Sequence, residues 1–193
     1  MKHPACLAAL AVAACTTTPA DSGQATTANP IDVAGEFPTE VRRTTMVVRS
    51  VEDSLVFYRD ALGLEVNYDT ILPVNSVAFS KGQPGRTMRL VLLNGADPWI
   101  GWIGLMEYID PPLPSEPIRP TELEVGSHIF VMSVKDADAQ CAKAAAAPGA
   151  RLAQEAGIAE YPGREGGPPI RVKGCQVWDA DGMLVELNQR LEN

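Results

Sequence analysis

The chain has 193 residues, enough for one compact domain or for two small fused modules with a hydrophobic core. Apolar residues make up 46% of the sequence and charged residues 21%, which is typical of a soluble globular protein. The formal net charge of -8 argues against nucleic acid or an anionic membrane surface as a partner.

The amino terminus has the composition of an export signal. Lys2 supplies a positive charge, a short apolar stretch runs from Cys6 to Ala14, and small residues precede a cysteine in Val12-Ala-Ala-Cys15. This pattern resembles the lipobox of bacterial lipoproteins, so residues 1–15 are expected to be a lipoprotein-type signal peptide with Cys15 as the lipidated residue. An ordinary signal peptide or a buried N-terminal helix is the alternative. The favoured interpretation predicts an exported protein on the periplasmic side of a bacterial membrane, attached through its lipid anchor only.

Residues 16–40 are rich in Thr, Ala, Pro and Gly and lack apolar periodicity, which predicts a flexible tether. After the tether, a first module is expected over residues 41–110. It begins with a strand at Thr44–Val48 and a helix that starts at Ser50 and ends at Gly63, a residue type that favours a left-handed helix cap. Strands are then predicted at Leu64–Tyr68, Val77–Phe79, Met88–Leu93 and Ile103–Ile109.

A Pro-rich linker over residues 111–123 separates this module from a second one over residues 124–193, which repeats the same order. A strand at His128–Val134 leads to a helix capped by Asp136 and ending near Ala147. Further strands are predicted at Arg151–Ala153, Ile170–Val177 and Leu184–Asn188. The simplest account is two βαβββ units in tandem. Cys141 and Cys175 remain after signal removal; export permits a disulfide, but two separate small buried side chains are the preferred interpretation.

Three ionisable residues interrupt or begin apolar strand-like runs. Glu107 lies within residues 104–109, His128 begins residues 128–134, and Glu186 lies within residues 184–188. Burying an ionisable side chain without a partner is unfavourable, so such residues indicate a functional site.

Two segments resemble the vicinal oxygen chelate superfamily, which includes lactoylglutathione lyase (glyoxalase I), extradiol dioxygenases and bleomycin-resistance proteins. The opening helix of that superfamily is similar to Val48-Arg-Ser-Val-Glu-Asp-Ser-Leu-Val-Phe-Tyr-Arg-Asp-Ala-Leu-Gly-Leu64. Its last hairpin is similar to Val177-Trp-Asp-Ala-Asp-Gly-Met-Leu-Val-Glu-Leu187, with Ala180 in place of a proline. The resemblance covers about residues 41–191. It implies an α+β fold in which tandem βαβββ modules form a half-open, barrel-like sheet around a cleft.

In glyoxalase-like members, four strands each point one metal ligand into the cleft. Glu107, His128 and Glu186 match three of these places, whereas the first place holds Arg43 in one register and Arg42 in another. Arginine is always protonated and offers no lone pair to a metal. Two alternatives follow from the resemblance: a divalent ion (Zn, Ni, Mn or Fe) held by the three matching residues, or an arginine–glutamate ion pair that replaces the metal.

The resemblance therefore implies two functions from different classes. The first is a metal-dependent lyase, isomerase or dioxygenase acting on a small oxygenated substrate, with Glu186 or Glu107 as general base and without a nucleotide cofactor. Its substrate pocket would be lined by Arg43, Trp99 and Trp102, with packing of the two tryptophans at the module junction as the alternative. The alternative is a metal-free protein that binds or sequesters a small molecule, as bleomycin-resistance members do. A homodimer is one arrangement that the resemblance allows, because modules pair within one chain or between two.

Overall fold

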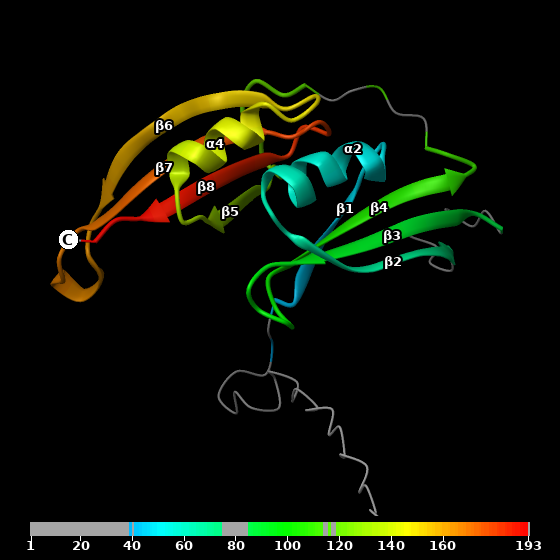
Figure 1. Cartoon of the computed structure of the whole chain (residues 1–193), viewed down its shortest axis with the longest axis horizontal. Coiled ribbons are helices and arrows are strands. Elements are labelled where there is room, and N and C mark those ends of the chain that lie inside the picture. Colours follow the sequence, from blue (N-terminus) through cyan, green and yellow to red (C-terminus); the bar gives the residue numbers. More distant parts are fainter. Residues whose placement is uncertain (1–38, 40, 75–84, 114–115, 117–118, 193) are drawn as a thin grey trace, which may run out of the picture.

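The computed structural model describes residues 39, 41–74, 85–113, 116 and 119–192, and it contains two halves with the same order of elements (Figure 1). The first half consists of β1 (Arg43–Val47), α2 (Val51–Leu55), the π-helical turn η1 (Val56–Ala61), β2 (Glu65–Pro73), β3 (Thr87–Asn94) and β4 (Trp102–Asp110). The second half consists of β5 (Ile129–Ser133), α4 (Ala137–Ala145), β6 (Arg151–Tyr161), the short 3-10 turn η2 (Arg164–Gly166), β7 (Ile170–Trp178) and β8 (Leu184–Arg190). No described helix has the length and apolar character needed to span a membrane.

The strands form two separate four-stranded sheets, in the orders β1-β4-β3-β2 and β5-β8-β7-β6. In each sheet the first strand pairs in parallel with the last strand of its half, and the other pairings are antiparallel. The predicted α+β class and the tandem βαβββ order are therefore confirmed. Each sheet stays open, and the two do not merge into one barrel-like sheet.

Strand lengths differ from the sequence prediction in both halves. The strand predicted at Leu64–Tyr68 continues to Pro73 as β2. The strand predicted at Arg151–Ala153 continues to Tyr161, because pairing with β7 supports a run of Ala, Gln, Glu and Gly residues that carries little strand signal of its own. His128 was expected inside a strand but precedes β5, which begins at Ile129. The strand predicted at Val77–Phe79 lies outside the described residues.

Both halves contribute to one hydrophobic core. Each helix packs on one face of its own sheet, and the two helices meet where the side-chain amide of Gln140 donates a hydrogen bond to the carbonyl oxygen of Ala61. Fully buried members of the core are Val51, Tyr58, Val91, Leu93, Leu105, Ala144, Val177, Val185 and Leu187. Because side chains alternate along a strand, the strand residues next to these members point to the opposite face of their sheet, which is open at β8 and buried at β4.

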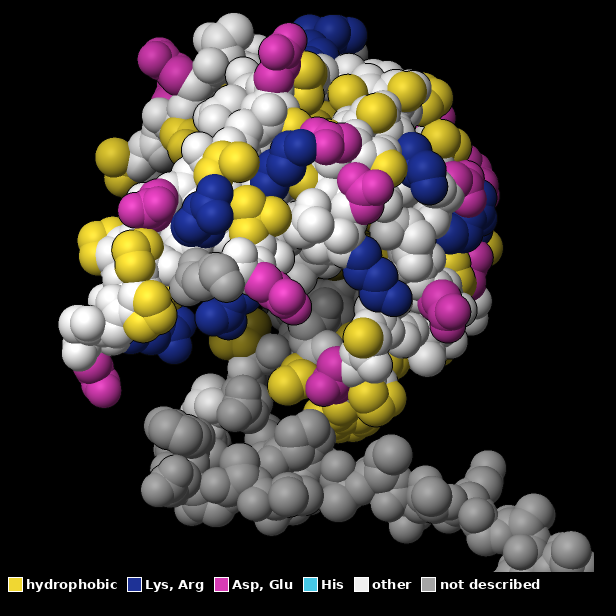
Figure 2. All heavy atoms as spheres, turned by 60° about the vertical axis from the view of Figure 1, so that its left-hand side comes forward, with side chains coloured by type: hydrophobic (Ala, Val, Ile, Leu, Met, Phe, Trp, Pro, Cys, Tyr) yellow, Lys and Arg dark blue, Asp and Glu magenta, His cyan; other side chains and the backbone are white. Residues whose placement is uncertain are grey.

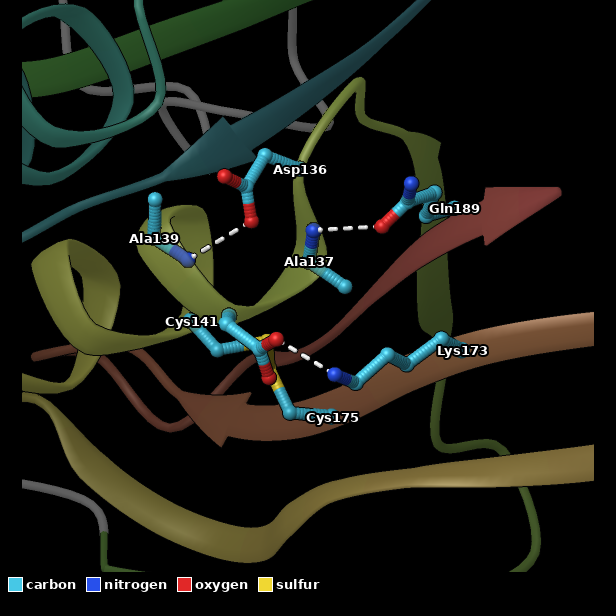
Figure 3. The surroundings of a disulfide bond; sticks show 8 residues. Asp136, Ala137, Ala139, Cys141, Lys173, Cys175 and Gln189 are labelled. Atoms are coloured by element: carbon cyan, nitrogen blue, oxygen red, sulfur yellow. Dashed lines mark hydrogen bonds and ion pairs between the residues drawn. A yellow bond between two sulfur atoms is a disulfide. The ribbon is translucent and has the colours of Figure 1, made fainter. Parts of the chain in front are cut away.

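A disulfide joins Cys141 of α4 to Cys175 of β7 (Figure 3). The preferred prediction of two separate thiols is therefore wrong. The helix packs directly on this strand, and the two residues lie on facing sides of that contact with their Cα atoms 6.1 Å apart. This separation is within the usual range for a disulfide.

Polar contacts connect the second half's β7–β8 turn to the helix of the first half. The Tyr58 hydroxyl donates to Asp179 at 2.8 Å, and the Arg49 guanidinium pairs with Asp181 at 2.7 Å. Burial raises the pKa of the Asp179 carboxyl, and burial together with the Asp179 charge raises the pKa of the Tyr58 phenol. The phenol therefore remains the donor in this pair, which ties the two halves together from within the core.

Candidate functional site

Glu186 lies on the open face of the second sheet. Its neighbours Val185 and Leu187 are fully buried in the core, so the pleat of β8 directs Glu186 and Asn188 to the other face. The Glu186 carboxylate accepts hydrogen bonds from the side-chain amide of Asn188 at 2.7 Å and from that of Gln176 at 2.9 Å. Gln176 is the residue opposite Glu186 on β7. The three side chains form one hydrogen-bonded set.

A hollow of about 150 Å³ lies beside this set. It is lined by Gln154, Gly157, Ile158, Ala159, Tyr161, Val172, Gly174, Cys175, Gln176, Glu186 and Asn188. Gly157 and Gly174 face each other across the β6–β7 pairing. A Cβ atom on Gly174 would come within 2.2 Å of Asn188 Oδ1, so only glycine permits Asn188 to lie across the strand here. The hollow follows from paired glycines next to a polar set.

Glu107 occupies the opposite kind of position. It shares a face of β4 with the buried core residue Leu105, which is the face that carries the helix. Glu107 Oε2 accepts the backbone N–H of Val51, the first residue of α2, at 2.8 Å. Beside it on β3, Arg89 pairs with Glu52 of the same helix turn at 2.6 Å. Glu107 therefore anchors the start of a helix, where a carboxylate is favourable because the helix amides are unsatisfied.

The second half repeats this arrangement with an amide in the place of the Glu107 carboxylate (Figure 3). Gln189 Oε1 accepts the backbone N–H of Ala137, the first residue of α4, at 3.0 Å. Beside it on β7, Lys173 pairs with Asp138 of the same helix turn. By position and by contact, Glu107 is thus the counterpart of Gln189 and not of Glu186.

The first-half counterpart of Glu186 is Gly104. Thr45 and Val131 each lie five residues before the N-cap of the following helix, and they pair with Gly104 and Glu186 respectively. A Cβ atom on Gly104 would come within 2.6 Å of Thr45 Oγ1, so the Thr45 side chain fills this position. The same count from the N-caps matches Arg43 with Ile129. His128 is one residue earlier and so corresponds to Arg42.

His128 is exposed and lines a different hollow, of about 560 Å³, with residues of the linker and with Trp178. The structure therefore does not bring the three predicted metal ligands together. Glu107 is on the helix-bearing face of the first sheet, His128 precedes β5, and only Glu186 lies on an open sheet face. Among the described residues, no group of three His, Cys, Asp or Glu side chains is arranged to hold a metal. The residues present do not fit the divalent ion that the sequence resemblance implies.

The expected substrate-pocket residues lie near one another, but in the first half. The guanidinium of Arg42 stacks over the Trp99 ring at 3.7 Å and lies 5.8 Å from the Trp102 ring. Trp102 is buried, donates its indole N–H to the Asp97 carbonyl at 3.3 Å and pairs with Arg43 across β1 and β4. The hollow beside Glu186 is lined by second-half residues alone, so this cluster does not border it. Cys15 lies outside the described residues.

Sequence reasoning missed Gln176, Asn188 and Gly174. Two signals in the sequence bear on the site, one on Asn188 and one on His128. The alternation in Leu184-Val-Glu-Leu-Asn188 puts Glu186 and Asn188 on one face. Aligning the halves on their N-cap residues, Ser50 and Asp136, pairs Arg43 with Ile129 and so shows that His128 is out of register.

The fold has been seen before. A glyoxalase family protein from Bacillus cereus superposes with a TM-score of 0.61 at 17% sequence identity, over 79% of this chain and 95% of that protein. The chain has the glyoxalase fold. Two further structures are less similar: glyoxalase I from Zea mays (TM-score 0.48, 18% identity, 76% of this chain) and a glyoxalase/bleomycin resistance protein/dioxygenase from Alicyclobacillus acidocaldarius (TM-score 0.43, 13% identity, 81% of this chain and 96% of that protein). This chain spans 44% of the length of the maize protein. No protein-family model and no curated protein matches the sequence.

Proposed function

We propose that this protein binds a small organic molecule without the help of a metal, on the open face of its second sheet. The observation that carries the proposal is the hydrogen-bonded set of Gln176, Glu186 and Asn188 beside a hollow that the paired glycines help to line. Concave sites with a few convergent polar groups and apolar walls are the usual form of small-molecule sites. The glyoxalase fold supplies the sheet but does not by itself assign an activity.

The competing proposal is a metal-dependent lyase, isomerase or dioxygenase using Zn, Ni, Mn or Fe. It needs at least three suitable ligands around one point, as catalytic metal sites have. Here the matching positions of the two halves are Arg43, Gly104, Ile129 and Glu186, which offer a single metal-binding side chain. An arginine–glutamate pair at this site is not among the described ion pairs either, since Glu186 is held by two amides. The metal-free function therefore has the better support.

The two proposals are separated by one pair of measurements on the purified mature chain. Titration with Zn²⁺, Ni²⁺, Mn²⁺ or Fe²⁺ is expected to give no stoichiometric site that depends on Glu107 or His128. A screen of small-molecule fragments by amide NMR is expected to give shifts concentrated at Gly157, Gly174 and their β8 neighbours. One equivalent of metal lost in a His128→Ala variant, or fragment shifts that avoid this face altogether, would contradict the proposal.

We further propose that the protein works in the cell envelope as a lipoprotein anchored at Cys15, with residues 16–40 as its tether. The Cys141–Cys175 disulfide supports this location, because disulfides persist in oxidising compartments outside the cytosol. On the face seen in Figure 2, basic and acidic side chains are interspersed among hydrophobic ones. A Cys15→Ser variant is expected to leave the membrane fraction, and unchanged fractionation would refute lipidation.

A further inference from the structure

We infer that the hollow beside Glu186 takes a small organic cation, meaning a protonated amine or amidinium attached to one apolar ring or short chain. This inference rests on the proposed function and names the class of ligand for the same site. It is carried by three independent features of the site: the direction of its hydrogen bonds, its charge and its apolar walls.

The hydrogen bonds give the site an accepting character. A carboxylate only accepts, so both amide groups must turn their NH₂ groups toward Glu186. The oxygen ends of Gln176 and Asn188 are then the acceptors that these side chains offer to a ligand. Asn188 Oδ1 lies directly over Gly174, a lining residue of the hollow. A ligand that donates several hydrogen bonds matches such a set, whereas an anion finds mainly acceptors.

The charge of the hollow is negative. Glu186 is the sole acidic side chain among its lining residues, which include no Lys, Arg or His. Nearby basic groups are engaged or directed elsewhere: Lys173 lies on the helix-bearing face and pairs with Asp138, and the Arg151 guanidinium donates to the Pro120 carbonyl at 2.7 Å. Arg190 lies two residues beyond Asn188 on the same face of β8, opposite Val172, and borders a separate hollow with Glu192, so it is outside the lining of this one. A ligand cation would therefore supply the charge that the lining lacks.

The remaining walls are apolar and suit a small hydrophobic body. Tyr161 is 49% exposed, and Ala159 and Val172, which pair across β6 and β7, lie on the same face. A cavity of about 150 Å³ admits a benzene ring. Exposed apolar side chains around one charged group are the pattern expected for an amphiphilic ligand, because the ring removes apolar surface from water while the cation pairs with Glu186.

The test uses three probes that share one ring and differ in charge: benzylammonium, benzyl alcohol and benzoate. Each is titrated into the mature chain while backbone amide NMR shifts of Gly157 and Gly174 are followed. Benzylammonium is expected to bind most tightly. Its affinity should fall as salt is raised and should be about tenfold lower in Glu186→Gln. The matched control is Glu160→Gln, the same change on β6 one residue beyond Ala159 and so on the other face of the sheet.

A second variant keeps the inference testable if Glu186→Gln does not fold. Ala159→Lys places a positive charge in the wall of the hollow, opposite Val172 and on the face that carries Gly157, and should weaken benzylammonium severalfold more than it weakens benzyl alcohol. Equal binding of benzyl alcohol and benzylammonium, with no effect of either variant, would overturn the cation and leave the proposed function standing. Absence of benzylammonium shifts at the hollow would also overturn the cation, and the fragment screen then decides the proposed function separately.

Discussion

Glu107 offers the sharpest test of how this fold is built. As the anchor of the α2 start it should contribute to the free energy of unfolding, whereas as a metal ligand it should not. In the structure its carboxylate accepts the N–H of Val51, a residue with 0% exposure, at the start of α2. Glu107→Ala leaves that buried N–H without its acceptor, which should lower the free energy of unfolding by about 1–3 kcal/mol. Glu107→Gln keeps an acceptor and loses only the interaction of a charge with the helix terminus, about 0.3–1 kcal/mol.

The second half contains the natural control for this experiment. Gln189 accepts the N–H of Ala137, which is also 0% exposed, with a neutral amide. Gln189→Ala should therefore reproduce the effect of Glu107→Ala, and Gln189→Glu should be tolerated. Urea denaturation followed by circular dichroism measures all four variants, and an unchanged slope with denaturant shows that only stability has changed. The reasoning is refuted if Glu107→Gln destabilises as much as Glu107→Ala, or if both leave stability unchanged.

Three further predictions concern the disulfide, the buried carboxyl and the exposed sheet edge. Replacing Cys141 and Cys175 together by Ala should lower stability by about 4 kcal/mol, from the loop entropy of a 34-residue separation, and urea denaturation of the reduced wild-type protein should show the same loss. Asp179 has a raised pKa in the folded state, so its contribution to stability is present at low pH and is lost as the pH rises through that pKa. Asp179→Asn should therefore gain stability relative to wild type as the pH is raised from 4 to 7, as measured by urea denaturation at each pH. A stability difference between the two proteins that stays constant over this pH range would contradict the raised pKa. Val131 is 63% exposed on the edge strand β5 and should promote self-association through this strand. Light scattering is expected to show a homodimer for the wild type and a monomer for Val131→Lys. A monomeric wild-type protein would exclude self-association through β5.

The buried Asp179 has a structural role at the junction between the halves. Its carboxylate accepts from the Tyr58 hydroxyl and from the backbone N–H groups of Asp181 and Met183. These bonds hold the β7–β8 turn in the shape that lets Asp181 reach Arg49 of the first half. A desolvated carboxyl is unfavourable, but the same group fixes both a turn and the relative placement of two sheets.

Sequence alone predicted the order of the helices and strands that the structure describes. The apolar periodicity of Val51, Leu55, Tyr58 and Leu62 predicts a helix, and its N-cap Ser50 and positive-φ Gly63 set the limits of the helical segment. The repetition of strand, helix and strands in two halves predicts the tandem arrangement seen in the two sheets. These features depend on residues close together in the chain, so local pattern determines them.

Tertiary structure decided which face each candidate site residue occupies. β4 is buried on both faces, so Trp102 to Tyr108 show no alternation of polar and apolar residues from which the direction of Glu107 follows. Only strand pairing and helix packing place Glu107 beneath α2 and Glu186 beside the hollow, although both follow similar apolar runs. The disulfide has the same origin, because the proximity of Cys141 and Cys175 arises from a helix docking on a strand that is distant in sequence. Local pattern therefore determined the elements, and long-range packing determined the chemistry that they expose.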